Sequence, residues 1–261
     1  MNRQIASTVF INSFQKEIRN KTFWVLFISS ILVMLAGRAF FKEMSFQMGN
    51  AMPLQQFDLY FYYFILFVWS FLVVTLLGIN CIKSDTRYGL AEQILAFPIR
   101  SESYLFLRIA ATAIMSWFFY AIIFSMMALF LMGTSPYPIS WKAIGAVFVF
   151  FGTIFTMTTL ASFWSLILGQ ISGFIALFLN IMIVIYINKH IGDFQFLFIP
   201  GFIIHWLFPH IAVLNQICSD LIFEPKLNES IKLWLEIPHF FLSTGFLFWF
   251  THFIFKKRGF K

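Results

Sequence analysis

The side chains that could bind a metal or a haem are the histidines and one series of methionines. The five histidines are His190, His205, His210, His239 and His252. His205 and His210 are five apart, which places them on different faces of a helix, and no cysteine or carboxylate cluster completes a metal site. Met44, Met48 and Met52 are spaced by four, and a row of thioethers can bind Cu(I). Because such residues also pack or form hydrogen bonds, we predict no metal site and keep haem or copper binding as the alternative.

The sequence contains none of the common nucleotide-binding or hydrolase motifs. It has no Gly-x-x-x-x-Gly-Lys-Ser/Thr, no His-Glu-x-x-His and no Gly-x-Ser-x-Gly. The chain therefore cannot bind ATP through a P-loop of its own. We predict that it is not an enzyme, and that it has no catalytic residues and no cofactor.

The composition predicts the kind of secondary structure that must position any site. Of 261 residues, 60% are hydrophobic and only 11% are charged, whereas soluble domains carry about 25% charged residues. So few charges could not cover the surface of a soluble fold of this size. We predict an all-α, polytopic integral membrane protein with a single transmembrane domain over residues 1–261. The two cysteines, Cys81 and Cys218, are predicted to lie near opposite faces and not to pair.

Uncharged stretches long enough to cross a hydrocarbon core of about 30 Å predict six spans. These stretches are 22–37, 59–82, 109–141, 143–188 and 237–255. Residues 133–138 (GTSPYP) are expected to end the third span near Met132. As one helix, 143–188 would be about 69 Å long, so we predict two spans with a turn at Gly169–Gly173. The alternative for this pair of glycines is a Gly-x-x-x-Gly helix-dimer motif.

A further uncharged stretch, residues 194–219, could form a seventh span, but it contains Pro200 and Pro209, each of which removes a helical hydrogen bond. We therefore expect the region 194–232 to form an extracytoplasmic re-entrant or interfacial helical hairpin before the last span, with a full span as the alternative.

The distribution of cations predicts the orientation. With six spans, both termini lie on one side, and that side carries twelve Lys/Arg against six on the other. The positive-inside rule then places the N- and C-termini in the cytoplasm. The net charge of +7 is explained by topology, and we expect no nucleic-acid partner.

Residues 2–20 precede the first span and are predicted to form an interfacial helix on the lipid bilayer. At 100° per residue, Phe10, Ile11, Phe14 and Ile18 cluster on one side, while Val9 falls off this stripe. The alternative is a loose basic tail that only sets the topology.

The cytoplasmic segment 83–108 is unusually polar, with seven charges in 26 residues. As a helix from Ser84 to Ala96 it would place Tyr88, Ala91 and Leu95 on one stripe, and Pro98 would end it. A short amphipathic helix of this kind fits a groove of another protein, although an ordinary solvated connector is the alternative.

This segment resembles the first cytoplasmic loop of ABC-2 type transporter permeases. The matching residues are Asp85, Gly89, Glu92, Ile94, Leu95, Pro98, Ile99, Arg100 and Arg108. The run 16–21 before the first span is similar to the N-terminal elbow of that family, and the loop is also similar to that of haem-export permeases. The resemblance covers the whole chain as topology and about 25 residues as motif.

The resemblance implies a permease of an ATP-driven exporter in the cytoplasmic (inner) membrane. Its partners would be two copies of an ABC ATPase subunit, which bind the ATP and Mg²⁺, and a second permease copy or a homologue. The loop 83–100 would contact the ATPase as a coupling helix. The residues expected to make that coupling are Asp85, Tyr88, Gly89, Glu92, Leu95, Pro98 and Arg100. The predicted spans contain no acid, which disfavours a proton-driven carrier.

Overall fold

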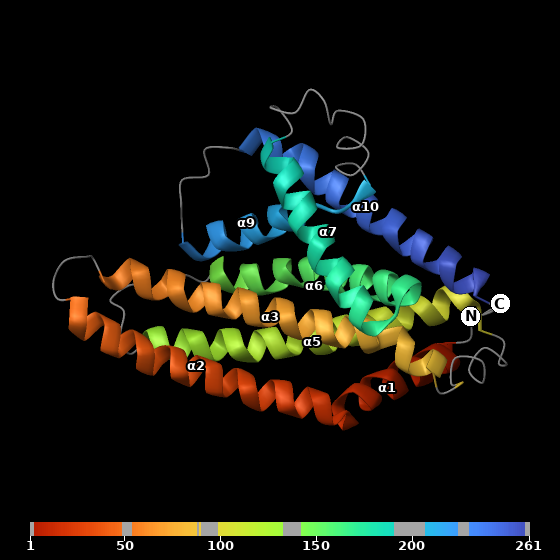
Figure 1. Ribbon diagram of the computed structural model, residues 1–261, viewed down its shortest axis with the longest axis horizontal. Coiled ribbons are helices and arrows are strands. Elements are labelled where there is room, and N and C mark those ends of the chain that lie inside the picture. The colour runs from red at the N-terminus through yellow and green to blue at the C-terminus, as the bar shows by residue number, and fades with distance from the viewer. Residues whose placement is uncertain are drawn as a thin grey trace.

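The computed structural model describes residues 3–48, 54–87, 89, 99–132, 142–190, 207–223 and 230–258. Regular secondary structure within these ranges is helical, and no strand occurs in them. The helices, which Figure 1 shows, are α1 (Arg3–Arg19), α2 (Lys21–Met48), α3 (Leu54–Arg87), α5 (Ser101–Met132), α6 (Lys142–Leu168), α7 (Gln170–His190), α9 (Ile211–Phe223) and α10 (Ser230–Lys257).

Helix α6 lies at the centre of the molecule. It contacts α3, α5, α7, α9 and α10, whereas α2 packs at the edge on α1, α3 and α5. Helices α2, α3, α5 and α6 run along the long axis, and α7 and α10 cross them obliquely (Figure 1). The beginning of α1 and the end of α10 lie at the same end of the molecule, where α3 ends and α5 begins (Figure 1).

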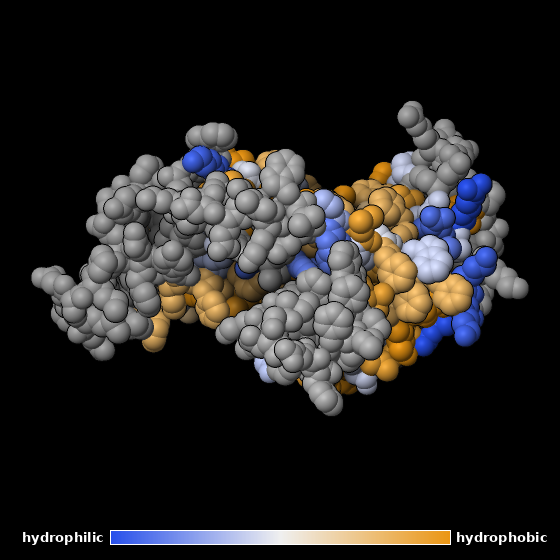
Figure 2. Space-filling model, turned by 90° about the horizontal axis from the view of Figure 1, so that it is seen from above, coloured by the Kyte–Doolittle hydropathy of each residue, from blue (hydrophilic) through white to orange (hydrophobic). Residues whose placement is uncertain are grey.

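The length and apolar character of the helices define a multi-pass membrane protein. Five of them contain stretches long and apolar enough to cross a bilayer: 21–40, 61–85, 101–130, 142–168 and 237–257. Large apolar side chains are exposed on α2, α7 and α10, as expected for helices that face lipid. Figure 2 shows hydrophilic residues gathered at one end of the visible face, beside a band of apolar residues. The predicted all-α fold is confirmed for the described residues, and five of the helices are candidate membrane spans.

Five of the predicted spans each lie within one helix, although several of these helices extend beyond the predicted bounds. Helix α5 ends at Met132, and the 143–188 stretch is two helices. The turn between them is at Gly169 alone, whose φ of +95° favours glycine. Gly173 lies inside α7, where a Cβ would come within 3.0 Å of the Ser165 backbone of α6. Helix α10 begins before the predicted span and includes Pro238.

The sixth predicted span and the hairpin have less support. The apolar part of α7 is Gln170–Val184, and it is shorter than the stretches that could cross a bilayer. Of the predicted hairpin region 194–232, the structure describes 207–223 and the beginning of α10. Within it, α9 packs against α6 and α10.

The helix predicted for residues 2–20 is present as α1, but its buried face differs from the predicted stripe. Val9, Ser13 and Glu17 are buried, while Ile11 is 51% exposed. The predicted stripe was assigned to the bilayer and not to a contact with other helices, and that assignment stays a prediction. The face of α1 that packs on α5 includes the polar side chains of Ser13 and Glu17, and the Glu17 carboxylate pairs with Arg108 of α5.

The closest crossing of α3 and α6 is at Gly78. A Cβ placed on Gly78 would lie 2.8 Å from the Cβ of Ala161 and 3.2 Å from the Cα of Thr158. The hydroxyl of Ser162 donates a hydrogen bond to the Gly78 carbonyl at 3.2 Å. Small residues therefore let the two backbones approach, as is common in membrane proteins.

We predict that Gly78→Ala destabilises the protein by about 1–3 kcal/mol, the usual cost of overpacking. The added methyl group meets α6 backbone atoms that cannot rotate away. The measurement is thermal or denaturant unfolding of the purified protein in detergent. Gly245→Ala in α10 is the control, since a Cβ there meets nothing within 4 Å. Equal stability of the two variants would contradict the close crossing.

Candidate functional site

The predicted coupling segment is described only at its two ends. Asp85 is in the last turn of α3, and Arg100 is exposed just before α5. Gly89 has a φ of +67°, so the predicted helix Ser84–Ala96 does not run unbroken. The correct arrangement is that α3 ends at Arg87 and a glycine in the left-handed region follows it. The four other predicted coupling residues, Tyr88, Glu92, Leu95 and Pro98, lie outside the described residues.

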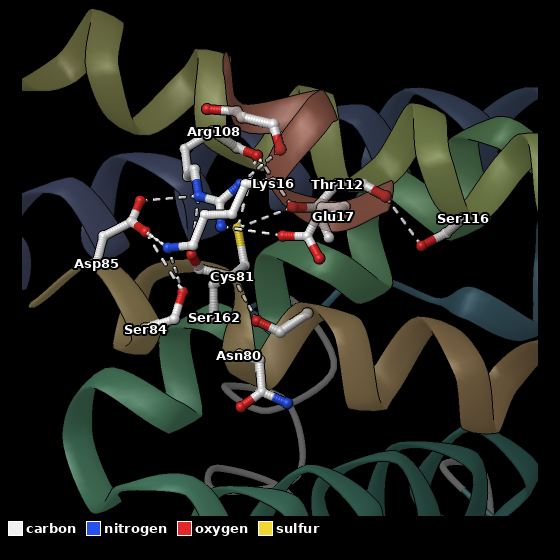
Figure 3. Close-up of polar contacts among 12 residues, drawn as sticks. Lys16, Glu17, Asn80, Cys81, Ser84, Asp85, Arg108, Thr112, Ser116 and Ser162 are labelled. Atoms are coloured by element: carbon white, nitrogen blue, oxygen red, sulfur yellow. Dashed lines mark hydrogen bonds and ion pairs between the residues drawn. The ribbon is translucent and has the colours of Figure 1, made fainter. Parts of the chain in front are cut away.

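The centre of this region is the guanidinium of Arg108, on α5, which is 1% exposed. Its Nε lies 2.9 Å from Oδ2 of Asp85 and donates to the Cys81 carbonyl at 2.9 Å. Its Nη2 donates to Oε1 of Glu17 at 2.9 Å, and Nη1 donates to the Ser13 carbonyl at 3.4 Å. Figure 3 shows the guanidinium between residues of α1 and α3. Arg108 thus joins three helices through one side chain.

The carboxylate of Asp85 is the second centre of the cluster and is 4% exposed. Besides Arg108, it forms an ion pair with Lys16 of α1. It also accepts a hydrogen bond from the hydroxyl of Tyr104 at 2.7 Å. Lys16 in turn donates to Oγ of Ser84 at 3.0 Å. The Asp85 carboxylate therefore has its partners inside the protein.

The local sequence explains why these groups meet. Ser13 and Glu17 are four apart, as are Cys81 and Asp85, and Tyr104 and Arg108, so each helix presents its pair on one face. Thr112, one further turn along α5, donates to the Cys81 sulfur at 3.3 Å. We call this set, Ser13, Lys16, Glu17, Cys81, Ser84, Asp85, Tyr104 and Arg108, the inner-end cluster.

The inner-end cluster balances two cations with two carboxylates. Burial raises the pKa of Glu17, and the neighbouring Arg108 guanidinium opposes that rise. Removing one member of such a buried ion pair leaves an uncompensated charge in an apolar setting. The cluster is therefore suited to hold α1, α3 and α5 together.

From the sequence, Lys16 and Arg108 were assigned to topology or to the loop pattern, and Glu17 only to the run 16–21 that is similar to the elbow. One signal could have revealed their pairing. Arg108 follows seven residues of α5 and leads into a long apolar stretch, and a cation placed there needs an opposite charge. What no spacing could show is that the partners come from α1 and α3.

The histidines and methionines are only partly covered by the described side chains. His210 and His239 are buried with ring centroids 4.5 Å apart, a pairing that the sequence spacing did not suggest. His252 lies 3.2 Å from Oγ of Ser101. Among the described residues, no group of three or more His, Cys, Asp or Glu could hold a metal ion. The side chains of Met44, Met48 and Met52 lie outside the part of the chain whose side chains the structure describes.

Both cysteines are free and buried. Cys81 belongs to the inner-end cluster, while the Cys218 thiol lies 3.5 Å from the Ala146 carbonyl.

Compared with protein-family models, with curated proteins and with solved structures, the chain gives no match.

We predict that Arg108→Gln lowers the free energy of unfolding by about 3–5 kcal/mol, because Glu17 and Asp85 lose a shared buried partner. Unfolding of the purified variant in detergent measures this. Arg100→Gln, which removes an exposed arginine eight residues earlier, is expected to change stability by less than about 0.5 kcal/mol. Similar losses for both variants would show that Arg108 acts only through net charge.

Proposed function

We propose that this chain is the transmembrane permease subunit of an ABC-2 type exporter, driven by separate ATPase subunits. The observation that supports it most is the inner-end cluster. It joins the N-terminal helix to the two helices on either side of the segment that resembles a coupling loop. Force applied to that segment would reach α1, α3 and α5 together.

In the proposed mechanism, an ATPase pair contacts the segment 88–100 and pushes on it when ATP closes the pair. ATP can shift the permease between inward- and outward-open states only if it binds one global state better than the other. Because Asp85 is held by Lys16 and Arg108, its role is to fix the base of the segment. Contact with the ATPase is then assigned to Glu92, Leu95 and Arg100.

The proposal includes six spans in the cytoplasmic membrane, with α7 as the sixth, and both termini in the cytoplasm. Two features support it: the ends of α1 and α10 lie together (Figure 1), and exposed Lys256, Lys257 and Arg258 close α10. The carboxylates in the apolar stretches, Asp85 and Glu102, lie at their ends. This arrangement supports an energy source outside the chain, with a second permease copy or a homologue completing the pathway.

We predict that Glu92→Gln and Leu95→Ala each weaken the complex with the ATPase at least about tenfold, the cost expected for an interface hot spot. The measurement is co-purification and ATPase stimulation with a P-loop ATPase subunit that is co-expressed with this chain. Glu102→Gln is the matched control, because Glu102 is exposed on the first turn of α5 but outside the segment. Unchanged coupling in both loop variants, with normal folding, would refute the role of the segment.

A haem- or copper-handling subunit is the second candidate, and the contact between His210 and His239 is the observation in its favour. It predicts a Soret band or bound copper in protein prepared with haem and copper supplied, and loss of that signal in His210→Ala. A preparation with neither signal would exclude this candidate and leave the exporter proposal intact.

A further inference from the structure

A polar cavity of about 610 Å³ lies beside the inner-end cluster, between α1, α3 and α7. It is lined by Asn12, Gln15, Lys16, Glu17, Arg19, Asn20, Thr22, Asn80, Ser84 and Gln170. Its volume is within the range of small-molecule sites, about 300–1,000 Å³. A lining without large apolar side chains is unusual for a membrane protein in which 60% of residues are hydrophobic.

The wall of the cavity is fixed by hydrogen bonds between helices. Gln170 opens α7 and donates from Nε2 to Oδ1 of Asn80 at 2.7 Å. Figure 3 shows Asn80 pointing away from Arg108, on the opposite side of α3. Asn20, between α1 and α2, accepts from the backbone N–H of Thr22 at 3.0 Å. The cavity is therefore built into the junction of four helices.

The lining favours an anion. Lys16 and Arg19 contribute two cations, and the only carboxylate in the lining, Glu17, is paired with Arg108. Lys16 is paired with Asp85, so Arg19 supplies the net positive charge. Amides and hydroxyls provide further hydrogen-bond donors, and the N-terminus of α7 adds the positive end of a helix dipole. A phosphate is the group best matched by this set.

The position of the cavity indicates the source of the phosphate. The apolar stretch of α2 begins at Lys21, and that of α3 ends at Asp85. The turn at Gly169 ends α6 and starts α7 at Gln170. The cavity is thus at the level where apolar helices meet water. Just beyond it, α2 exposes Val25 and Ile28, and α7 exposes Ile171 and Ile175, surfaces suited to acyl chains.

We propose that this cavity binds the phosphodiester headgroup of an anionic phospholipid. Arg19 contacts the phosphate, and Asn80 and Gln170 hydrogen-bond to the remaining polar atoms of the headgroup. The acyl chains lie along α2 and α7. A bound lipid would bridge α1 and α7. The proposal requires the membrane location of these helices and does not depend on an ATPase.

The test is a titration of the purified protein in detergent, followed by native mass spectrometry. The probes are phosphatidylglycerol, phosphatidylcholine with the same acyl chains, and sn-glycerol 3-phosphate. We expect phosphatidylglycerol to bind most tightly. Arg19→Gln should weaken its binding about tenfold, since a hydrogen bond to a charged group is lost. Asn12→Trp should weaken binding similarly, by filling the cavity without a change of charge.

Lys21→Gln is the matched control, because Lys21 is an exposed cation two residues from Arg19 and is not part of the lining. It should leave the affinity unchanged. Equal losses in Arg19→Gln and Lys21→Gln, or no loss in Asn12→Trp, would show attraction to surface charge and overturn the proposal. Equal binding of sn-glycerol 3-phosphate and phosphatidylglycerol would overturn the lipid as the source. Unchanged melting temperatures would show that the variants fold.

Discussion

The burial of the Arg108 guanidinium is the constraint on which the inner end of this structure depends. A cation removed from water must find opposite charge and hydrogen-bond acceptors. Asp85, Glu17 and the carbonyls of Ser13 and Cys81 meet that demand from two other helices. The positions of α1, α3 and α5 at this end are therefore linked. A shift of one helix would leave a charge on another without its partner.

At mid-depth the helices are held by a different principle. Small residues such as Gly78 and Ala161 bring α3 and α6 together. Hydroxyl groups on α6 then bond across the seams, as Ser162 does to Gly78 and Thr156 to Thr244 at 3.0 Å. In lipid there is no hydrophobic force between helices, so packing and such bonds must supply the association. Nine of the fifteen buried residues of α6 are accordingly Ala, Ser or Thr.

These two principles place the polar features of the molecule at one end. The inner-end cluster and the polar cavity adjoin each other, and Lys16, Glu17 and Ser84 belong to both. A headgroup bound in the cavity would sit next to the ion pair that fixes the base of the predicted coupling segment. Lipid composition and the movement of that segment would then be physically connected.

The helices themselves were predictable because local chemistry decides them. The lack of charge over 59–82 or 143–168 requires a membrane helix, and Gly169 provides the turn that the length of the 143–188 stretch demands. The site was less predictable. Asp85 and Arg108 were recognised in one segment, but their pairing with Lys16 and Glu17 of α1 was not. The face of α1 that packs against other helices, with Val9, Ser13 and Glu17 buried, was not predicted either. Both depend on contacts between helices that are distant in the sequence.

The sequence by itself determined that the chain is suited to a lipid bilayer, that its fold is helical and where its spans approximately lie. Each of these follows from the cost of placing charge or backbone in lipid. Only the tertiary structure decided which charges neutralise one another and where a polar cavity opens. Ion pairs such as Glu17 with Arg108 join residues 91 positions apart. Their formation depends on how three helices cross, and no local pattern encodes that geometry.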